Sequence, residues 1–465
     1  MNSGKAIVSL FVLLLVPCSL TLAQVDSVDA FVLTEMANRR IPGLALAVIQ
    51  NGALVKVKGY GLANIELNVP VTPQTVFQSG SVGKQFTATA VMQLVEEGKL
   101  RLDDQLTKYF PQSPDSWRDI TIRHLLSHTS GIPDWETDSA VINLRNDYTE
   151  GQLLHKAMSL RLDFQPGERW SYSNTGYIVL GILIHEVAGK FYGDVLRERV
   201  FRPLAMEAAR IISEADIVLN RAAGYRLVDG EVKNQEWVSP SLNTTADGSL
   251  YLSILDLVKW DASLNTEKVL KKSSLEQMWT PVRLKGDSLH PYGFGWDLSS
   301  VNGRKARRHS GSWQGFNSYI ARFVDDKLTV IVLVNRDRAN PSRIAHGVAG
   351  FYAPVLASRI LAPIVDTDPA LTAFVRQLHE KPDTVNIRLE VFTAEYQPKV
   401  KPFLISNKGS LEIFGNVRSV ALVESRKESD TQLSFYRVSY KAGSRLVVVS
   451  RNKQGKIKVV NSAME

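Results

Sequence analysis

The sequence predicts a mixed α/β (α+β) protein, in which helices and antiparallel strand pairs follow one another along 465 residues. Three observations predict this class: a hairpin pattern near the N-terminus, a switch to helical spacing soon after it, and a strongly β-branched hairpin near residue 325. With 44% hydrophobic and 22% charged residues the chain has the composition of an ordinary folded protein, and its length allows two or three domains.

Residues 1–23 have the order of a secretory signal peptide: one cation at Lys5, an apolar run, and the small-residue end Thr21-Leu22-Ala23. We therefore expect cleavage and export, to the periplasm or the cell exterior, with no stable membrane span afterwards. The alternative is an uncleaved anchor, because an apolar run of roughly 18 residues can just span a bilayer. A lipoprotein signal at Cys18 is disfavoured, since Pro17 stands where such signals place a small residue.

Cys18 is the only cysteine, so the cleaved chain would have neither a disulfide nor thiolate chemistry. The net charge of +8 comes from scattered cations, with one dense cluster at Arg304–His309. A scattered charge of this size predicts no nucleic-acid partner.

Residues 41–64 read as two strands around Asn51-Gly52, the strongest short hairpin signal. In residues 81–100 the apolar residues then recur at helical spacing, and Gly98 stands where it would end this helix. Because small and apolar residues cover nearly all of its sides, this helix should be central and buried. The residues that set its period are Val82, Phe86, Ala90, Val91 and Leu94.

Ser253 and Asp256 form a capping-box-like pair at the start of a second predicted helix. Residues 317–335 then predict a hairpin that turns at Asp325-Asp326 and has β-branched arms. These elements belong to a first domain, predicted over residues 24–365.

A composition shift at Leu361–Leu371, where two prolines flank acidic residues, predicts a second, small α+β domain over residues 366–465. It would contain a helix within 371–381 and strands within 411–427, 432–443 and 444–460, with turns at Gly443 and Gln454-Gly455.

The stretch GSVGKQFTA, from Gly80 to Ala88, allows two chemical interpretations. A phosphate-binding loop needs four residues between its first glycine and the Gly-Lys pair, but only two separate Gly80 from Gly83, so this interpretation fails. On a helix, Lys84 lies one turn from Ser81, which fits a nucleophile and its base. Ser81 would open the helix, where the dipole favours an alkoxide, and a buried Lys84 of lowered pKa can accept its proton. Taken alone, this spacing also fits an ordinary capped helix.

Two other stretches carry candidate residues. In ERWSYSNTGY, Tyr172 and Asn174 are two apart, so in an extended chain their side chains point the same way, toward one cavity. In RRHSGSWQGFNS, Gly311 would let a ligand approach the backbone, and His309 could bind a carboxylate or a proton. Each alone also fits a polar loop or a surface histidine beside arginines.

In this order, the three stretches make the chain resemble the serine β-lactamase and penicillin-binding-protein superfamily, specifically its class C-like branch. That branch includes DD-peptidases, D-aminopeptidases, family VIII-type esterases and other β-lactamase-related hydrolases. The resemblance spans residues 28 to about 355 and rests on IPGLALAVIQNG, ITIRHLLSHTSGIPDW, FQPGERWSYSNTGY, YGFGW and HSGSWQGF.

The resemblance implies a β-lactamase/transpeptidase-like fold, with an antiparallel sheet flanked by helices and an all-helical lobe. It makes Ser81 the acylated nucleophile, Lys84 its partner, and Tyr172 a general base whose phenol has a lowered pKa and later serves as the acid. Whether Lys84 or Tyr172 takes the first proton stays open at this stage. More loosely, the C-terminal domain resembles small domains of the cystatin or nuclear-transport-factor type, with no role specified.

The resemblance also assigns substrate-binding residues. Asn174 would bind the acyl-side amide of the substrate, and the backbone N–H groups of Ser81 and Ser312 would form the oxyanion hole. Ser312 follows the triplet His309-Ser310-Gly311, which departs from the Lys-Thr-Gly of classical β-lactamases.

In those enzymes the fixed charge of the lysine meets the antibiotic's carboxylate. We expect His309 to be neutral at pH 7, because Arg304, Arg307 and Arg308 would oppose its protonation. This predicts substrates that lack a carboxylate beside the scissile bond and puts efficient antibiotic hydrolysis in doubt.

The combined expectation is an exported serine hydrolase that forms an acyl-enzyme on Ser81. It would cleave an amide or ester in a small molecule or short peptide, including peptidoglycan-derived ones. The alternatives are a carboxylesterase of the family VIII type and a catalytically idle protein that binds peptidoglycan fragments. An idle site has no need of Ser81, Lys84 and Tyr172 together, which argues against the last alternative.

No cofactor and no metal are expected, and the sequence does not specify the oligomeric state. His185-Glu186 lacks the second histidine of a zinc-protease helix. His124 and His128 would share one helical face, and we interpret them as structural.

Overall fold

The computed structural model describes residues 26–135, 142–211, 216–357, 362–380, 387–401, 404, 415–428, 430–441 and 443–464. The predicted signal peptide, residues 1–23, and its Cys18 lie outside these ranges. Within them, no helix combines the length and the apolar character needed to cross a membrane.

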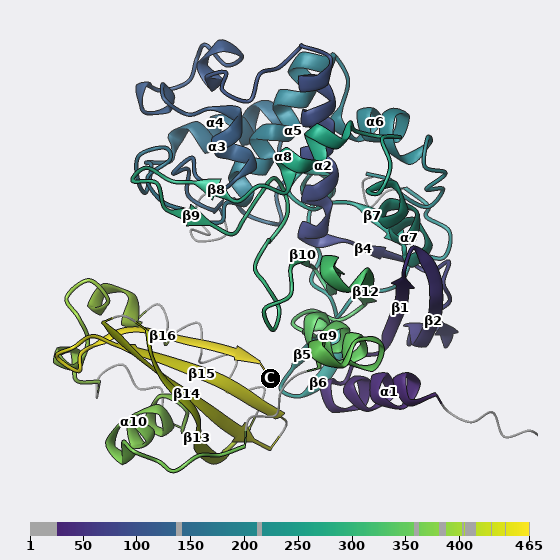
Figure 1. The fold of residues 1–465 in the computed structure, drawn as a ribbon. Coiled ribbons are helices and arrows are strands. Elements are labelled where there is room, and N and C mark those ends of the chain that lie inside the picture. The colour runs from purple at the N-terminus through teal and green to yellow at the C-terminus, as the bar shows by residue number, and fades with distance from the viewer. Residues whose placement is uncertain are drawn as a thin grey trace, which may run out of the picture.

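A six-stranded antiparallel sheet organises the first part of the chain (Figure 1). Its order is β10-β11-β12-β1-β2-β3, so an N-terminal strand pairs with a strand from near residue 330. Both hairpins predicted within this sheet are confirmed, with β1 joined to β2 and β11 to β12. The strands are β1 (Gly43–Gln50), β2 (Ala53–Asn64), β3 (Val69–Pro70), β10 (Ala306–Trp313), β11 (Phe316–Phe323) and β12 (Leu328–Val334).

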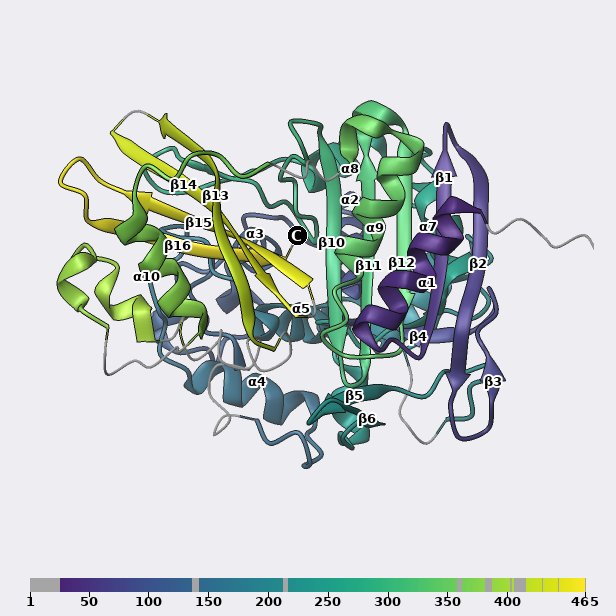
Figure 2. The ribbon, with the colours of Figure 1, turned by 90° about the horizontal axis from the view of Figure 1, so that it is seen from below.

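Helices cover both faces of this sheet. On one face, α1 (Ser27–Arg39) and α9 (Pro341–Tyr352) pack on alternate residues of β1 and β12, such as Leu46 and Val332. Figure 2 shows these two helices in front of the strands. The opposite face, with Ala47 and Ile331, joins a larger core that includes α7 (Ile254–Ser263). Burial on both faces explains why β1 is an unbroken apolar run.

The helical lobe lies at the top of Figure 1. Its central helix α2 contacts α5 and α6, and the side chains from Lys84 to Met92 are all buried, as predicted. The capped start of α7 is also confirmed, because Ser253 Oγ accepts the Asp256 N–H at 3.2 Å. The lobe helices are α2 (Lys84–Glu96), α3 (Ile122–Leu126), α4 (Glu150–Ser159), α5 (Asn174–Ala188), α6 (Tyr192–Leu196) and α8 (Lys272–Met278).

Short strand pairs connect these layers. They are β4 (Val76–Gln78) with β7 (Tyr251–Ser253), β5 (Tyr225–Val228) with β6 (Glu231–Asn234), and β8 (Val282–Arg283) with β9 (Leu289–His290). The pair β4-β7 matters most for function, since β4 ends directly before the Ser81 turn.

The C-terminal part forms a second antiparallel sheet, with helix α10 packed on β13 and β14. Among the described residues its core shares no member with the two cores of the first sheet. The helix predicted within 371–381 is confirmed, whereas residues 405–414, which overlap the first predicted strand, lie outside the described residues. The 365/366 boundary stays a prediction. The elements are α10 (Pro369–Glu380), β13 (Val417–Glu428), β14 (Thr431–Tyr440), β15 (Gly443–Arg451) and β16 (Ile457–Met464).

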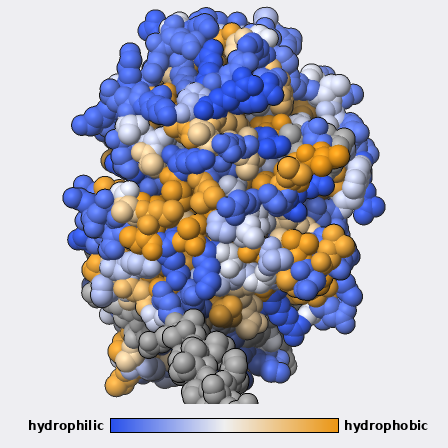
Figure 3. All heavy atoms as spheres, turned by 90° about the vertical axis from the view of Figure 1, so that its right-hand side faces the viewer, coloured by the Kyte–Doolittle hydropathy of each residue, from blue (hydrophilic) through white to orange (hydrophobic). Residues whose placement is uncertain are grey.

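The outer strands β2 and β3 contribute to the face seen in Figure 3, where apolar groups lie among hydrophilic ones. Exposed apolar side chains on these strands include Leu54, Val55 and Val69. Short β3 pairs with β2 only near Leu62 and Asn64, so most of the β2 edge has no strand partner in the described sheet.

Candidate active site

Ser81 lies in a 3₁₀ turn, η1 (Gly80–Gly83), between the end of β4 and the start of α2. Lys84 is the first residue of α2, and its fully buried Nζ lies 3.1 Å from Ser81 Oγ. The predicted one-turn relation between the two residues is confirmed. Ser81 itself precedes the α-helix by a tighter turn instead of opening it.

Lys84 Nζ also donates to Asn174 Oδ1 at 2.6 Å and to the backbone carbonyl of Asp247. The amide nitrogen of Asn174 in turn donates to the Asp134 carboxylate at 3.1 Å. These contacts orient the Asn174 amide, with its oxygen toward Lys84 and its nitrogen toward Asp134. The extended chain predicted for this stretch ends at Ser173, because Asn174 already begins α5.

Tyr172 joins the same cluster. Lys84 Nζ lies 4.9 Å from the centroid of its ring, and its hydroxyl is hydrogen-bonded to Ser81. Burial raises the pKa of Tyr172 well above the usual 10, and the bond to Ser81 opposes this shift only in part. The predicted lowering of this pKa is therefore wrong: loss of water around the phenol outweighs the stabilisation of a phenolate.

The candidate oxyanion hole lies where η1 meets β10. Arg308 exchanges backbone hydrogen bonds with Asp297 at 2.8 and 2.9 Å on the outer edge of β10. Strand alternation then places the backbone groups of Ser310 and Ser312 on that same outer edge. A Cβ added to Gly80, whose φ is +51°, would lie 2.4 Å from Ser312 N. The Ser312 backbone is thus pressed against the turn that carries Ser81.

Gly311 has a packing role that the sequence did not predict. A Cβ added there would lie 1.9 Å from Ser79 O and 2.3 Å from Ser318 Oγ. The glycine is therefore required by close contact with the protein's own chain, while the approach of a ligand to its backbone stays a prediction. Ser310, by contrast, has an exposed side chain.

His309 is buried beside the cluster, with Nε2 2.8 Å from the Tyr292 hydroxyl and Nδ1 2.6 Å from Ser310 O. Burial lowers the pKa of His309 to about 4. A neutral imidazole at pH 7 is therefore confirmed. Both ring nitrogens contact protein atoms, so neither offers a free donor to a substrate carboxylate.

The cause predicted for this neutrality is wrong, because the three arginines are engaged elsewhere. Arg304 pairs with Asp326 at 2.9 Å and Arg308 with Asp297 at 3.0 Å. The third, Arg307, lies 3.7 Å above the ring centroid of Trp279.

The predicted helical pairing of His124 and His128 is also wrong. The helix α3 ends at Leu126, and His128 has a left-handed φ of +59°. His124 closes a capping box, in which its Nδ1 accepts the Thr121 N–H at 3.2 Å. Across the described ranges no cluster of three or more His, Cys, Asp or Glu residues is arranged to hold a metal ion.

Sequence reasoning missed the side-chain partners of this site. Asp134 and Tyr292 stand in stretches already noted, but nothing in their spacing links them to Asn174 or His309. His128 Nε2 lies 3.2 Å from the Tyr292 hydroxyl, a contact between residues 164 positions apart. Such long-range pairs follow from the packed fold alone.

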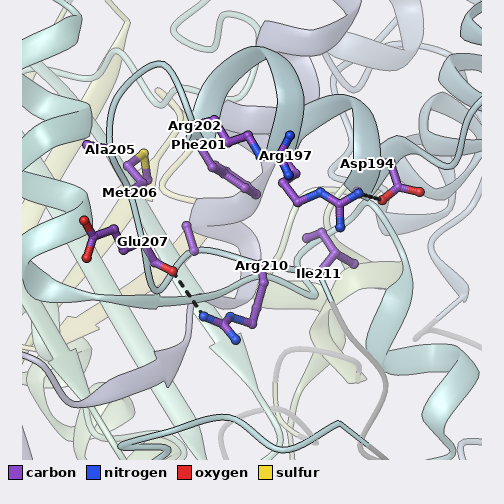
Figure 4. A pocket seen from close by; sticks show the side chains of 11 residues that line it. Asp194, Arg197, Phe201, Arg202, Ala205, Met206, Glu207, Arg210 and Ile211 are labelled. Carbon is purple, nitrogen blue, oxygen red and sulfur yellow. Dashed lines mark hydrogen bonds and ion pairs between the residues drawn. The ribbon is translucent and has the colours of Figure 1, made fainter.

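An open cavity of about 540 Å³ lies elsewhere, beside α6, and contains none of the site residues above (Figure 4). It is lined in part by Arg197, Arg202 and Arg210. Two of these are engaged within the cavity wall: Arg197 pairs with Asp194 at 2.8 Å, and Arg210 donates to Glu207 O at 3.1 Å.

Comparison with known proteins agrees with this geometry. The family model described as Beta-lactamase matches residues 28–353. Penicillin-binding protein 4* of Bacillus subtilis (strain 168) is 30% identical over 313 residues, which cover 63% of this chain and 68% of that protein. A D-aminopeptidase of Gluconobacter oxydans (strain 621H) is 27% identical over 303 residues, 63% of this chain and 56% of the relative.

Solved structures extend the likeness. The octameric penicillin-binding protein homologue from Pyrococcus abyssi has a TM-score of 0.63 at 25% identity and covers 94% of this chain and 98% of its own. The D-amino acid amidase from Ochrobactrum anthropi SV3, complexed with L-phenylalanine, has a TM-score of 0.59 at 26% identity and covers 66% of this chain and 90% of its own. The predicted β-lactamase/transpeptidase-like fold is confirmed, while assignment to the class C-like branch stays a prediction. The chain belongs to the beta-lactamase family and is a serine hydrolase of that family.

Proposed function

We propose that this protein is an exported hydrolase that cleaves amide or ester bonds of small substrates through an acyl-enzyme on Ser81. The observation that carries the proposal is the convergence on Ser81 Oγ of the buried Lys84 amine, at 3.1 Å, and the Tyr172 hydroxyl. A nucleophile with two proton-transfer groups in hydrogen-bond contact has the arrangement that acyl transfer requires.

Lys84 is proposed as the first base. Two of its contacts, Asn174 Oδ1 and Asp247 O, are carbonyl oxygens that only accept. A neutral amine donates its two hydrogens to them and keeps its lone pair for the Ser81 hydroxyl. Ser81 Oγ then attacks the substrate carbonyl carbon while its proton passes to Lys84. The N–H groups of Ser81 and Ser312 stabilise the resulting oxyanion.

Tyr172 is proposed as the acid for the leaving group. Its raised pKa keeps the phenol protonated, so it can donate to the departing amine or alkoxide as the C–N or C–O bond breaks. The Lys84 ammonium then returns a proton to the phenolate. Water completes the cycle by attacking the acyl-enzyme along the reverse proton path.

The proposed substrates carry no carboxylate beside the scissile bond. His309 stands where classical β-lactamases have a charged lysine, and both of its nitrogens are bonded within the protein. Amino acid amides fit this requirement, in line with the D-aminopeptidase and D-amino acid amidase among the similar proteins. Neutral esters fit the same requirement, which makes a carboxylesterase the second candidate.

The test compares a D-amino acid amide, a short-chain ester and a chromogenic cephalosporin on the purified wild type and on Ser81→Ala. We expect turnover of the amide or the ester, little of the cephalosporin, and none of any in Ser81→Ala. Labelling by an active-serine probe should be lost in Ser81→Ala and kept in Ser159→Ala, which removes an exposed hydroxyl on α4. Activity of Ser81→Ala within tenfold of the wild type would refute the assignment.

Export is proposed from the pattern of residues 1–23. Mass spectrometry of the protein from its native host should find an N-terminus near Gln24, in the exported fraction of the cells. An intact N-terminus in the membrane fraction would favour the uncleaved anchor.

A further inference from the structure

Behind Tyr172 lies a row of three buried side chains, His128, Tyr292 and His309, and the proposed function assigns no role to the first two. His128 Nε2 lies 3.2 Å from the Tyr292 hydroxyl, and that hydroxyl lies 2.8 Å from His309 Nε2. His128 and Tyr292 are 1% and 4% exposed, so water does not compete for these bonds. His128 is 164 positions from Tyr292 in the sequence, and the three residues meet directly beside the site.

The direction of these hydrogen bonds is set by the backbone at both ends. The Ser173 N–H, which can only donate, lies 3.1 Å from His128 Nδ1. His128 therefore carries its proton on Nε2 and donates to Tyr292. At the other end, Ser310 O can only accept, so His309 carries its proton on Nδ1. The Tyr292 hydroxyl then accepts from His128 and donates to His309.

In this chain of hydrogen bonds, which runs from Ser173 to Ser310, every donor has one acceptor and both imidazoles are neutral. A proton added to His128 would point an N–H at the Ser173 N–H. One added to His309 would leave the Tyr292 hydroxyl without its acceptor. Burial lowers the pKa of both imidazoles, which agrees with this assignment.

Both ends of the hydrogen-bond chain lie next to proposed catalytic groups. Ser173 directly follows Tyr172, and the His128 ring lies 4.3 Å from the Tyr172 ring, centroid to centroid. Ser310 O is on the outer edge of β10, two residues before the Ser312 N–H of the candidate oxyanion hole. The chain thus ties the loop of the proposed acid to the strand of the proposed oxyanion hole.

We infer that His128 and Tyr292 are positioning residues, which hold Tyr172 and the Ser312 N–H in register through a directed, neutral hydrogen-bond chain that includes His309. The inference rests on the proposed function, because it concerns the groups to which that function assigns proton transfer and oxyanion binding. Small misplacements of such groups cost far more in rate than in binding.

The central test is Tyr292→Phe, which keeps the ring and breaks two bonds of the chain. We expect kcat for a hydrolysed amide to fall at least about tenfold, with KM within about twofold of the wild type. The matched control is Tyr319→Phe, which removes a hydroxyl 3.0 Å from His346 on the opposite face of the sheet. It should change kcat by less than about twofold.

A second variant, His128→Asn, keeps an acceptor for the Ser173 N–H and tolerates the left-handed φ of +59°. It loses the hydrogen bond to Tyr292, so we expect the same fall in kcat as in Tyr292→Phe, with KM again little changed. The double variant should lose little more than either single one, since both break the same chain. Nitrogen-15 spectra of labelled histidines should show the Nε2–H form for His128 and the Nδ1–H form for His309 at pH 7.

Additive losses in the double variant, the opposite tautomers, or a Tyr292→Phe that behaves like Tyr319→Phe would overturn the inference. These outcomes differ from failure of the proposed function, which appears as activity in Ser81→Ala. If Tyr292→Phe fails to fold, the tautomers in the wild-type spectra decide the question.

Discussion

The Tyr172 hydroxyl is hydrogen-bonded to the nucleophile and its ring lies beside the Lys84 amine, yet burial raises its pKa well above 10. Its proposed role as an acid predicts a loss that depends on the leaving group. Tyr172→Phe should lower kcat for an amide by about 10² or more, the usual scale of acid–base catalysis, because an amine must be protonated as it leaves. The acylation step of a nitrophenyl ester, seen as the initial burst of nitrophenol, should slow far less, because this leaving group needs no proton.

Acylation rates on the two substrates across pH 6–10, taken from single-turnover and burst-phase kinetics, measure this difference. The wild type should show no rise in rate assignable to tyrosine ionisation in that range. Equal losses on the amide and the ester would indicate instead that Tyr172, and not Lys84, takes the first proton from Ser81.

His309 allows a test of substrate class. At a pKa of about 4 it stays neutral above pH 5, so KM for a carboxylate-bearing substrate should not improve between pH 8 and pH 5. His309→Lys places a permanent charge at this position and should raise kcat/KM for D-Ala-D-Ala-type peptides relative to neutral esters. A wild type that already hydrolyses carboxylate-bearing substrates as well as their neutral counterparts at pH 7–8 would contradict this expectation.

Residue-level prediction succeeded where the chemistry is local in sequence. Ser81 and Lys84 are one turn apart, so their contact follows from spacing. It failed for the pKa of Tyr172, because the direction of that shift is set by burial of the phenol, which the sequence does not reveal. It also failed for Asp134 and Tyr292, whose partners are set by tertiary packing.

At the scale of elements, the meeting of η1 and β10 depends on Gly80. Gly80→Ala should reduce kcat strongly, because its Cβ would lie 2.4 Å from Ser312 N and would push apart the two proposed oxyanion donors. Loss of one such donor typically costs about 10²-fold or more. Steady-state kinetics and thermal unfolding of the variant measure the effect.

Gly98→Ala is the matched control. Its φ of +70° imposes a similar backbone strain, roughly 1 kcal/mol, but an added Cβ meets nothing within 4 Å. It should lose stability and keep kcat. Equal kcat values in the two variants would show that the contact with Ser312 does not matter for catalysis.

The elements themselves were largely predictable. Asn51-Gly52, Ser253 with Asp256, and the β-branched arms around residue 325 each carry a local signal that the fold respects. The helical conformation of Asn174 was not predictable, because the cap at Ser173 separates an extended loop from a helix within two residues. The order of strands in the sheet was not predictable from local signals either, because β1 pairs with β12, a strand almost a whole domain away in the sequence.

For the whole molecule, buried histidines predict sensitivity to mild acid. Burial lowers the pKa of His309, His346 and His379 to about 4, from a usual 6.5. Between these values the unfolded chain binds more protons than the folded one. The stability that depends on neutral imidazoles is complete above pH 6.5 and is lost as the pH falls toward 4.

Each histidine contributes up to about 1.4 kcal/mol per pH unit inside this window. Calorimetry should therefore find an unfolding temperature that falls steeply from pH 6.5 to pH 4.5 and changes little from pH 6.5 to pH 7.5. His346→Gln should make the fall shallower. An unfolding temperature that is the same at pH 4.5 and pH 6.5 would contradict the prediction.

The two edges of the main sheet face different risks of association between molecules. Exposed strand edges can template pairing with another chain. The β2 edge is long and carries exposed Leu54 and Val55, whereas β10 is capped at Arg308 by its pairing with Asp297. Only the short stretch around Ser310 and Ser312 remains, and Gly80 presses against its end. This free edge is too short to nucleate a strand from a second molecule, so it can stay open to solvent without inviting aggregation.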